Sequence, residues 1–153
     1  MKIQYIQGNL FETDIKHIVH GCNAQGVMGS GVAAIIRRNY PEAYQSYTAR
    51  YKNRGLSLGE IQIIPSNDKI IINAITQNNF GGNARHANYE AIAVAMESIN
   101  NLFYNLPNCK VAMPLIGAGL ANGDWNVISA IIESELRTVQ PVVYHIEPLE
   151  NFL

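Results

Sequence analysis

Short apolar runs alternate with segments of helical period along the whole chain, and this alternation restricts the possible folds more than any other feature. Each apolar run is bounded by glycine, proline or polar residues, and each intervening segment repeats its apolar residues every three or four positions. This pattern predicts an α/β fold in which helices cover both faces of a sheet that is mostly parallel in its middle. The expected strands are 2–8, 17–23, 59–66, 69–76, 110–116 and 141–148, and the expected helical faces run over 32–40, 41–53, 92–106 and 128–136.

Length and composition predict one globular domain covering residues 1–153. The 153 residues are 48% hydrophobic and 15% charged, and they contain neither an internal repeat nor a linker-like segment. A net charge of −1 without blocks of like charge gives no sign of the basic face on which non-specific nucleic-acid binding depends. We therefore expect no stand-alone nucleic-acid binding.

Targeting and cysteine patterns favour a cytoplasmic protein. The N-terminus lacks the apolar run of a signal peptide, and the longest apolar runs are far below the roughly 20 residues that span a bilayer, so no membrane partner is expected. Cys22 and Cys109 lie far apart without a CxxC pattern. A structural zinc site and a disulfide framework are both disfavoured.

Two expected strand-to-helix junctions, residues 26–31 and 117–123, are rich in glycine and carry no charge. Ligands of open α/β sheets bind at the carboxyl ends of the strands, where glycines let backbone N–H groups approach a phosphate. Two such loops facing one crevice would clamp a diphosphate without a lysine. The alternative is that both are ordinary turns.

Two nucleotide-binding motifs were compared with these junctions. The chain has no Gly-Lys-Ser/Thr, which excludes a P-loop. Residues 29–34 match G-x-G-x-x-G/A literally, but "CNAQGVM" separates them from the strand, and no acidic residue ends the next strand about 20 residues on. A dinucleotide-binding dehydrogenase is therefore disfavoured, whereas a nucleotide diphosphate ligand is not.

Four segments, taken in order, resemble the ligand-binding segments of macro domains: "GNLF" (8–11), "VHGCNAQGVMGSGVA" (19–33), "INAITQNNFGG" (72–82) and "MPLIGAGLANGDW" (113–125). The resemblance covers nearly the whole chain. It is nearest to the small ADP-ribose-1''-phosphate phosphatases, and less near to terminal ADP-ribose glycohydrolases and DNA de-ADP-ribosylating antitoxins. It implies a three-layer αβα fold with a mixed, centrally parallel sheet that binds ADP-ribose without metal or cofactor.

The resemblance also implies the site residues. Asn9 falls where many macro domains use an aspartate for the adenine amino group, and an asparagine oxygen also accepts that bond, without charge assistance. Asn23 matches the asparagine that contacts the distal ribose, and Gly117 to Leu120 match the loop around the diphosphate. The implied ligand-binding residues are Asn9, Leu10, Asn23, Gly26, Val27, Met28, Gly29, Ser30, Gly31, Val32, Thr76, Phe80, Ile116, Gly117, Ala118, Gly119 and Leu120.

Several residues of this chain differ from those that other macro domains use in catalysis, and these differences reduce the number of reaction mechanisms open to it. The lysine of the glycohydrolase and antitoxin branches is Gln77 here, the aspartate after their G-x-G-L is Ala121, and residues 24–34 hold no carboxylate. His20 aligns with a histidine of the phosphatase branch. Its strand is expected to deliver it to the crevice mouth as the catalytic acid or base, with Asn23 as the second catalytic residue. The alternatives are a His20 hydrogen-bonded within the strand layer and an Asn23 that bonds its own loop.

Five further residues are open to a structural or a functional interpretation. Cys22 is expected to be a buried apolar filler rather than a nucleophile, and Asp124 the N-cap of the following helix. Arg85 and His86 either touch a terminal phosphate or are solvated. His145, in the last strand, is expected to be structural.

The leading function is therefore hydrolysis of ADP-ribose-1''-phosphate to ADP-ribose and phosphate. A de-ADP-ribosylating hydrolase acting on protein or nucleic acid and a non-catalytic ADP-ribose-binding module are the alternatives. The expected partner is an ADP-ribose derivative, either free or attached to a macromolecule.

Overall fold

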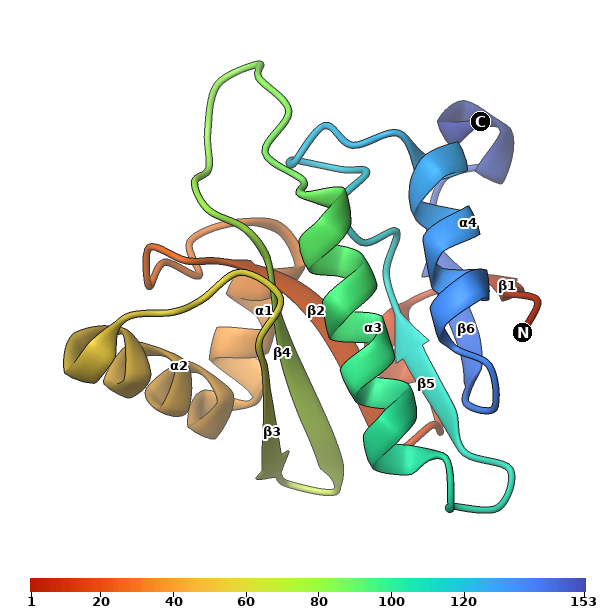
Figure 1. Cartoon of the computed structure of the whole chain (residues 1–153), viewed down its shortest axis with the longest axis horizontal. Helices are drawn as coiled ribbons and strands as arrows, with labels where there is room; N and C mark the ends of the chain where they lie inside the picture. Colours follow the sequence, from red (N-terminus) through yellow and green to blue (C-terminus); the bar gives the residue numbers. More distant parts are fainter.

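A six-stranded sheet in the order β1-β6-β5-β2-β4-β3 forms the middle layer of the computed structural model, which describes all 153 residues (Figure 1). Neighbouring strands from β1 to β4 are parallel, and β3 alone is antiparallel to its neighbour β4. The expected mixed, centrally parallel sheet is confirmed. The strands are β1 (Gln4–Gln7), β2 (His17–Asn23), β3 (Ile61–Ser66), β4 (Lys69–Gln77), β5 (Lys110–Met113) and β6 (Gln140–His145).

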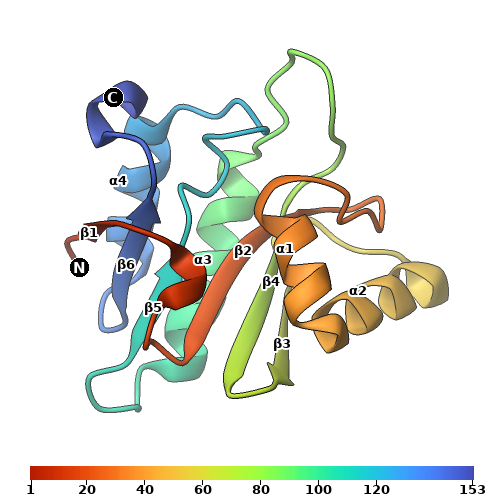
Figure 2. The ribbon, with the colours of Figure 1, turned by 180° about the vertical axis from the view of Figure 1, so that it is seen from behind.

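Helices cover both faces of this sheet, as expected. α3 (Tyr89–Phe103) and α4 (Trp125–Glu135) lie on the face seen in Figure 1, and α1 (Gly31–Asn39) and α2 (Pro41–Arg54) lie on the opposite face, seen in Figure 2. Two short 3-10 helices, η1 (Leu10–Glu12) and η2 (Leu149–Phe152), follow β1 and β6. The architecture is a three-layer αβα sandwich. No helix in it is both long enough and apolar enough to span a bilayer.

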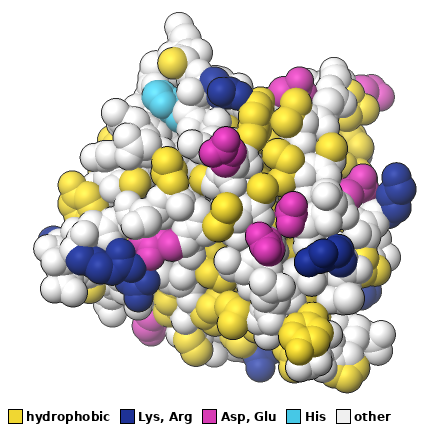
Figure 3. Space-filling view, viewed as in Figure 1, with side chains coloured by type: hydrophobic (Ala, Val, Ile, Leu, Met, Phe, Trp, Pro, Cys, Tyr) yellow, Lys and Arg dark blue, Asp and Glu magenta, His cyan; other side chains and the backbone are white.

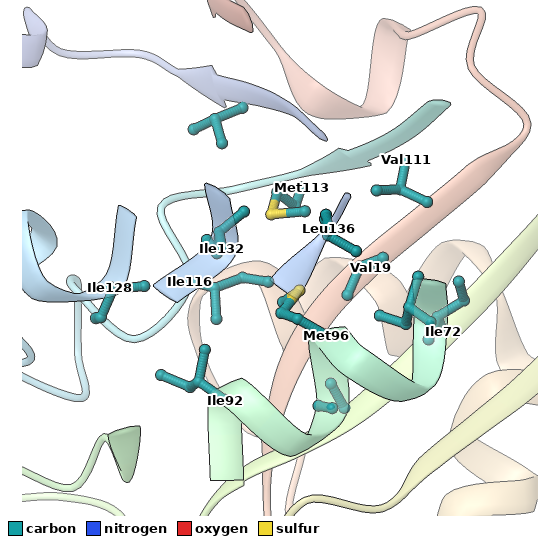
Figure 4. Close-up of a cluster of buried hydrophobic side chains, with 14 of the residues drawn as sticks. Val19, Ile72, Ile92, Met96, Val111, Met113, Ile116, Ile128, Ile132 and Leu136 are labelled. Carbon is teal, nitrogen blue, oxygen red and sulfur yellow. The ribbon is translucent and has the colours of Figure 1, made fainter. Parts of the chain in front are cut away.

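Apolar side chains are buried on both faces of the sheet, in one large core under α3 and α4 and in two smaller cores under α1 and α2. Ile92 and Met96 of α3 meet Ile128 and Ile132 of α4 above Val19 of β2 in the larger core (Figure 4). The smaller cores, under α1 and α2, hold buried side chains from the other face of β2 and β4. Because β2 is covered on both sides, five of its seven residues are buried and none is exposed, so buried and exposed positions do not alternate along it.

Three elements end three residues earlier than the sequence predicts, and one of them is β6, which ends at His145 rather than at residue 148. β5 ends at Met113 instead of continuing to residue 116, because Pro114 has no N–H to donate to the ladder and Ile116 N turns back to donate to Pro114 O at 2.8 Å. α3 ends at Phe103, before Leu106. The predicted turn between β3 and β4 is confirmed, with Asn67 in the left-handed region at φ 54°.

Candidate functional site

Five parallel strands end at the same edge of the sheet, at the top of Figure 1, and three long loops leave from this edge. They are residues 24–30 after β2, 78–88 after β4 and 114–124 after β5. The last two are joined, since the N–H groups of His86 and Ala87 donate to Ala121 O at 2.8 and 3.2 Å and Asn122 Nδ2 donates to Ala84 O at 3.1 Å. These three loops, from different parts of the sequence, surround this edge of the sheet, which is called the rim below.

The first glycine loop delivers an uncapped helix N-terminus to this rim. Ser30 is the N-cap residue of α1, yet its side chain makes no capping hydrogen bond, and the first turn of α1 contains no acidic residue. The N–H groups of that turn have no intrahelical partner and add to the positive end of the helix dipole. Gly31, at φ 59°, faces the second glycine loop, because a Cβ at this position would lie 3.2 Å from Leu120 Cδ1. The two loops meet, as the clamp interpretation requires.

The second glycine loop is closed on itself. Gly123 N donates to Gly117 O at 2.7 Å, and Gly117 has a φ of 76°. A Cβ at Gly123 would lie 2.5 Å from Gly117 O, so the closure needs a glycine there. Leu120 stands at the tip of the loop with 69% of its surface exposed, and Ile116 lies buried at its base. The loop is thus held closed by its own backbone hydrogen bonds, which use the N–H groups of Ala118, Asn122 and Gly123.

Asn23 sits under the first loop, and its side chain is committed to that loop. Its Oδ1 accepts from Gln25 N at 3.0 Å and from Val27 N at 3.4 Å, and its Nδ2 donates to Val27 O at 2.8 Å. Tyr47 OH lies 2.9 Å from the same Oδ1, and the side chain is nearly buried. Of the two interpretations of Asn23, this geometry agrees with the one in which its side chain bonds its own loop.

His20 does not lie at the crevice mouth. Its ring is fully buried on the α2 side of the sheet, and Nε2 lies 2.6 Å from Asn73 Oδ1. Asn73 Nδ2 in turn donates to Ala43 O at 3.0 Å and to Gln62 Oε1 at 3.2 Å. Burial lowers the pKa of His20 to about 4, against a smaller raising effect of the Asn73 hydrogen bond. The expectation that β2 delivers this ring to the crevice is wrong, and the ring is hydrogen-bonded within the strand layer.

Burial also makes Cys22 a poor nucleophile. Its thiol is buried, with Sγ 3.6 Å from His20 Nε2, and burial raises the pKa of the thiol far above its ordinary value. The expectation of a buried filler is confirmed. Thr76, at the end of β4, is also buried, and its hydroxyl has no hydrogen-bond partner. A Cβ at the neighbouring Gly21 would approach this hydroxyl to 2.6 Å.

The remaining predicted residues lie on or beside the loops of the rim, but the side chain of Met28 is buried in the small core that holds Cys22 and Tyr47. Asn9 is exposed and caps η1 by accepting from Phe11 N at 2.9 Å, with Leu10 buried beside it. Phe80 is 48% exposed on the loop after β4. On the same loop the Arg85 guanidinium lies 4.4 Å from the centre of the Tyr89 ring, and His86 Nε2 lies 2.5 Å from Gly81 O.

The side chains of Asp124, Gln77 and His145 each make a hydrogen bond to a backbone group two positions further along the chain. Asp124 accepts from Asn126 N at 2.9 Å, so the expected N-cap of α4 is confirmed. Gln77 Nε2 donates to Asn79 O at 2.7 Å. His145 Nδ1 lies 2.6 Å from Glu147 O, a structural contact as expected.

Residues 19–132 match the family model of the macro domain. The chain belongs to the macro domain family. Relatives from two of the three expected groups, the phosphatases and the DNA de-ADP-ribosylating proteins, are found, so the family resemblance of the four motifs is confirmed. The DNA ADP-ribosyl glycohydrolase of Thermus aquaticus is 26% identical over 155 residues, covering 97% of this chain and 42% of that protein. The ADP-ribose 1''-phosphate phosphatase of Candida albicans is 32% identical over 137 residues, covering 80% of this chain and 86% of that protein.

Solved structures agree with this assignment. The macrodomain of Mycobacterium tuberculosis DarG superimposes with a TM-score of 0.81 at 26% identity, covering 93% of this chain and 96% of that one. The Thermus and Candida proteins reported above are both hydrolases by name. This chain spans less than half of the Thermus protein, so that similarity concerns only a part of the longer chain.

Two features of this macro domain were not foreseen from its sequence. Tyr47 of α2 is fully buried and bonds the backbone and side chain of Asn23, which lies 24 positions earlier. A hollow of about 400 Å³ adjoins the second glycine loop and is bordered by the end of the chain. It is lined by Ala118, Gly123, Asp124, Trp125, Asn126, Asn151, Phe152 and Leu153. Neither feature carries a local sequence signal, because each depends on residues distant in the sequence.

Proposed function

We propose that this macro domain binds ADP-ribose at the rim and hydrolyses an ADP-ribose derivative, foremost ADP-ribose-1''-phosphate. One observation carries the proposal: the uncapped N-terminus of α1 faces the closed ring of residues 117–123, and Gly31 and Leu120 bring the two together. Neither loop has a charged side chain. Such a site favours a diphosphate held by backbone N–H groups.

The residues at the two ends of this diphosphate site indicate where the adenine and the distal ribose would bind. Asn9 and Leu10 stand where β1 leaves the sheet, and the Asn9 amide is exposed, which suits a purine edge. The distal ribose belongs beside Gly26 to Met28, on the loop that Asn23 holds. Asn23 then acts on the ribose through the shape of the loop, since most of its own hydrogen-bonding capacity is used within the chain.

The proposed reaction is attack of water on the phosphorus of the 1''-phosphate. The bond between phosphorus and the ribose oxygen breaks, the oxygen takes a proton to become the hydroxyl of ADP-ribose, and inorganic phosphate leaves. Loop N–H groups directed at the phosphoryl oxygens stabilise the charge that develops there. We assign no proton transfer to His20, because its ring is sealed between Asn73 and α2 and is neutral above pH 4.

Similarity to the glycohydrolase of Thermus aquaticus and to the DarG macrodomain supports a second candidate, removal of ADP-ribose from a macromolecule. The position of the lysine in that branch is occupied by Gln77, whose amide is held by Asn79 O. A water-based cleavage of the glycosidic bond would then replace a lysine adduct. This difference in residue chemistry makes the phosphatase the leading proposal.

Released products separate the candidates. Purified protein is incubated with ADP-ribose-1''-phosphate, ADP-ribosylated protein and an ADP-ribosylated DNA oligonucleotide, and free phosphate and free ADP-ribose are measured. Phosphate from the first substrate supports the leading proposal, and ADP-ribose from either macromolecule supports the second. Binding of ADP-ribose without turnover leaves a binding module, and failure to bind ADP-ribose contradicts all three.

A further inference from the structure

We infer that Tyr47 of α2, supported by Tyr51, is a positioning residue that holds the first glycine loop in the shape needed to bind ligand. The inference rests on the proposed function, because it assigns the loop's shape a role in binding ADP-ribose. Neither tyrosine is expected to touch the ligand. Both act from below the loop, through Asn23 and Gly26.

Tyr47 makes its contact from a fully buried position in the middle of α2. Its hydroxyl donates to Asn23 O at 2.6 Å and lies 2.9 Å from Asn23 Oδ1. Burial raises the pKa of the phenol, so the proton that makes this bond is retained at every physiological pH. A buried hydroxyl bonded in this way fixes its acceptor strongly, because the carbonyl has no water to replace it.

Asn23 passes this constraint to the loop. Its Oδ1 receives the N–H groups of Gln25 and Val27, and its Nδ2 holds Val27 O, so residues 23–27 form one hydrogen-bonded turn. Three residues beyond Val27 lies Ser30, the N-cap of α1, and the uncapped N–H groups of the first turn of the helix follow it. The direction in which those groups point is therefore set by a turn whose centre is bonded to Tyr47.

Tyr51 provides a second point of support, one helical turn further along α2. Its ring lies against Gly26, where a Cβ would approach the ring to 2.7 Å. Residues i and i+4 of a helix share a face, so Tyr47 and Tyr51 meet the loop together. Gly26 has a φ of 76°, and the flat ring below it leaves no room for any other residue.

Removal of the Tyr47 hydroxyl tests the inference. Tyr47→Phe keeps the ring and deletes the donor, and we expect the Kd for ADP-ribose and the KM for ADP-ribose-1''-phosphate to rise about fivefold to twentyfold, with kcat within about twofold. Amide hydrogen exchange of residues 24–31 is expected to rise in parallel. Binding is measured at about 10 °C on variant protein whose circular dichroism matches that of the wild type, so that a loss of global stability alone does not alter it.

Thr138→Val is the matched control. It deletes a hydroxyl that donates to Asn100 Oδ1 at 3.2 Å, near the start of β6 and so at the opposite edge of the sheet. It is expected to lower stability slightly while ADP-ribose affinity and loop exchange stay at wild-type values. If Tyr47→Phe fails to fold, Tyr51→Ala replaces it, because 41% of the Tyr51 surface is exposed, and the same rise in Kd and loop exchange is expected.

The two proposals fail in different ways. Wild-type loop exchange in Tyr47→Phe, or an ADP-ribose Kd unchanged within twofold, overturns the positioning role of Tyr47 while leaving the proposed function intact. Absence of ADP-ribose binding by the wild-type protein overturns the proposed function. In that case the exchange measurement still decides whether Tyr47 holds the loop.

Discussion

At the scale of single residues, most polar groups close to the rim are already bonded to the protein. Asn23 bonds its own loop, Asp124 caps α4, Gln77 holds Asn79 and His20 is paired with Asn73. The two glycine loops themselves offer backbone N–H groups and no charged side chain. A site of this composition binds through the shape of its loops, and the residues that control loop shape are the glycines and their supports.

The buried His20 makes stability depend on pH. Its folded pKa is about 4 and its unfolded value is near 6.5, so between these values the unfolded chain binds a proton that the folded chain excludes. Stability therefore falls as the pH drops from 6.5 towards 4, by about 1.4 kcal/mol per unit and about 3 kcal/mol in total from this group. Urea unfolding between pH 7.5 and 4.5 measures the slope.

His20→Gln provides the comparison, since an amide at this position does not titrate. The variant is expected to be less stable at pH 7.5 but to lose less further stability in acid than the wild type. Carboxylates such as Glu60, whose pKa is lowered by its hydrogen bonds to Ser57 and Arg54, contribute equally to both proteins. Parallel slopes for the two proteins would show that His20 is not the group responsible.

The closure of the second loop is tested at Gly123. In Gly123→Ala the added methyl group meets the carbonyl of Gly117, which is backbone and cannot rotate away, so a loss of about 1–3 kcal/mol in unfolding free energy is expected. Gly119→Ala is the matched substitution, because a Cβ at that position meets nothing within 4 Å. Equal unfolding free energies for the two variants, measured in urea, would contradict the closure argument.

At the scale of elements, the strands and the glycine loops were predictable and the facing of side chains was not. Period and length located all six strands, and the prediction that two uncharged loops meet at one edge follows from parallel strand order. The side on which His20 lies is invisible in the sequence, because β2 is buried on both faces and its alternation carries no polar signal. The partners Tyr47 and Asn73 come from other elements, 24 and 53 positions from the residues they bond.

The N-terminus of α1 yields a prediction in which stability and binding change independently. Ser30→Asp places a good N-cap residue at an exposed position where Ser makes no capping bond, so the unfolding free energy should be unchanged or slightly higher. The carboxylate occupies the region proposed for the diphosphate, and ADP-ribose affinity should fall at least tenfold. Isothermal titration calorimetry measures the affinity.

Ser30→Asn separates charge from shape in that experiment. Asparagine has the same size and an equal capping preference but no charge, so its affinity should stay within about threefold of wild type. Equal affinities of the Asp and Asn variants would mean that the anion does not bind at this helix end. A further increase of the difference between them at low salt would identify its electrostatic origin.

At the scale of the whole molecule, positive and negative charges are nearly balanced, with 11 Lys and Arg residues against 12 Asp and Glu residues. Lys and Arg side chains are dispersed among Asp and Glu on the face shown in Figure 3, in keeping with a net charge of −1. Arg50 and Arg54 are both paired with Glu60, at 3.2 and 2.7 Å, which removes one local cluster of positive charge. The proposed binding of ADP-ribose therefore relies on the rim and not on attraction between a polyanion and this face.

Ligand-linked stabilisation distinguishes these two sources of binding. A ligand that binds only the folded state stabilises it by about 2.7 kcal/mol at a free concentration one hundred times its Kd, which for a domain of this size raises Tm by roughly 5–10 °C. ADP-ribose should produce this shift in the wild type and a much smaller one at the same concentration in Ser30→Asp. An unmodified single-stranded oligonucleotide should produce none at 150 mM salt, because no basic face releases counterions from it. An oligonucleotide shift that disappears as salt increases would reveal a polyanion site outside the rim, and the rim would then not account for all binding by this macro domain.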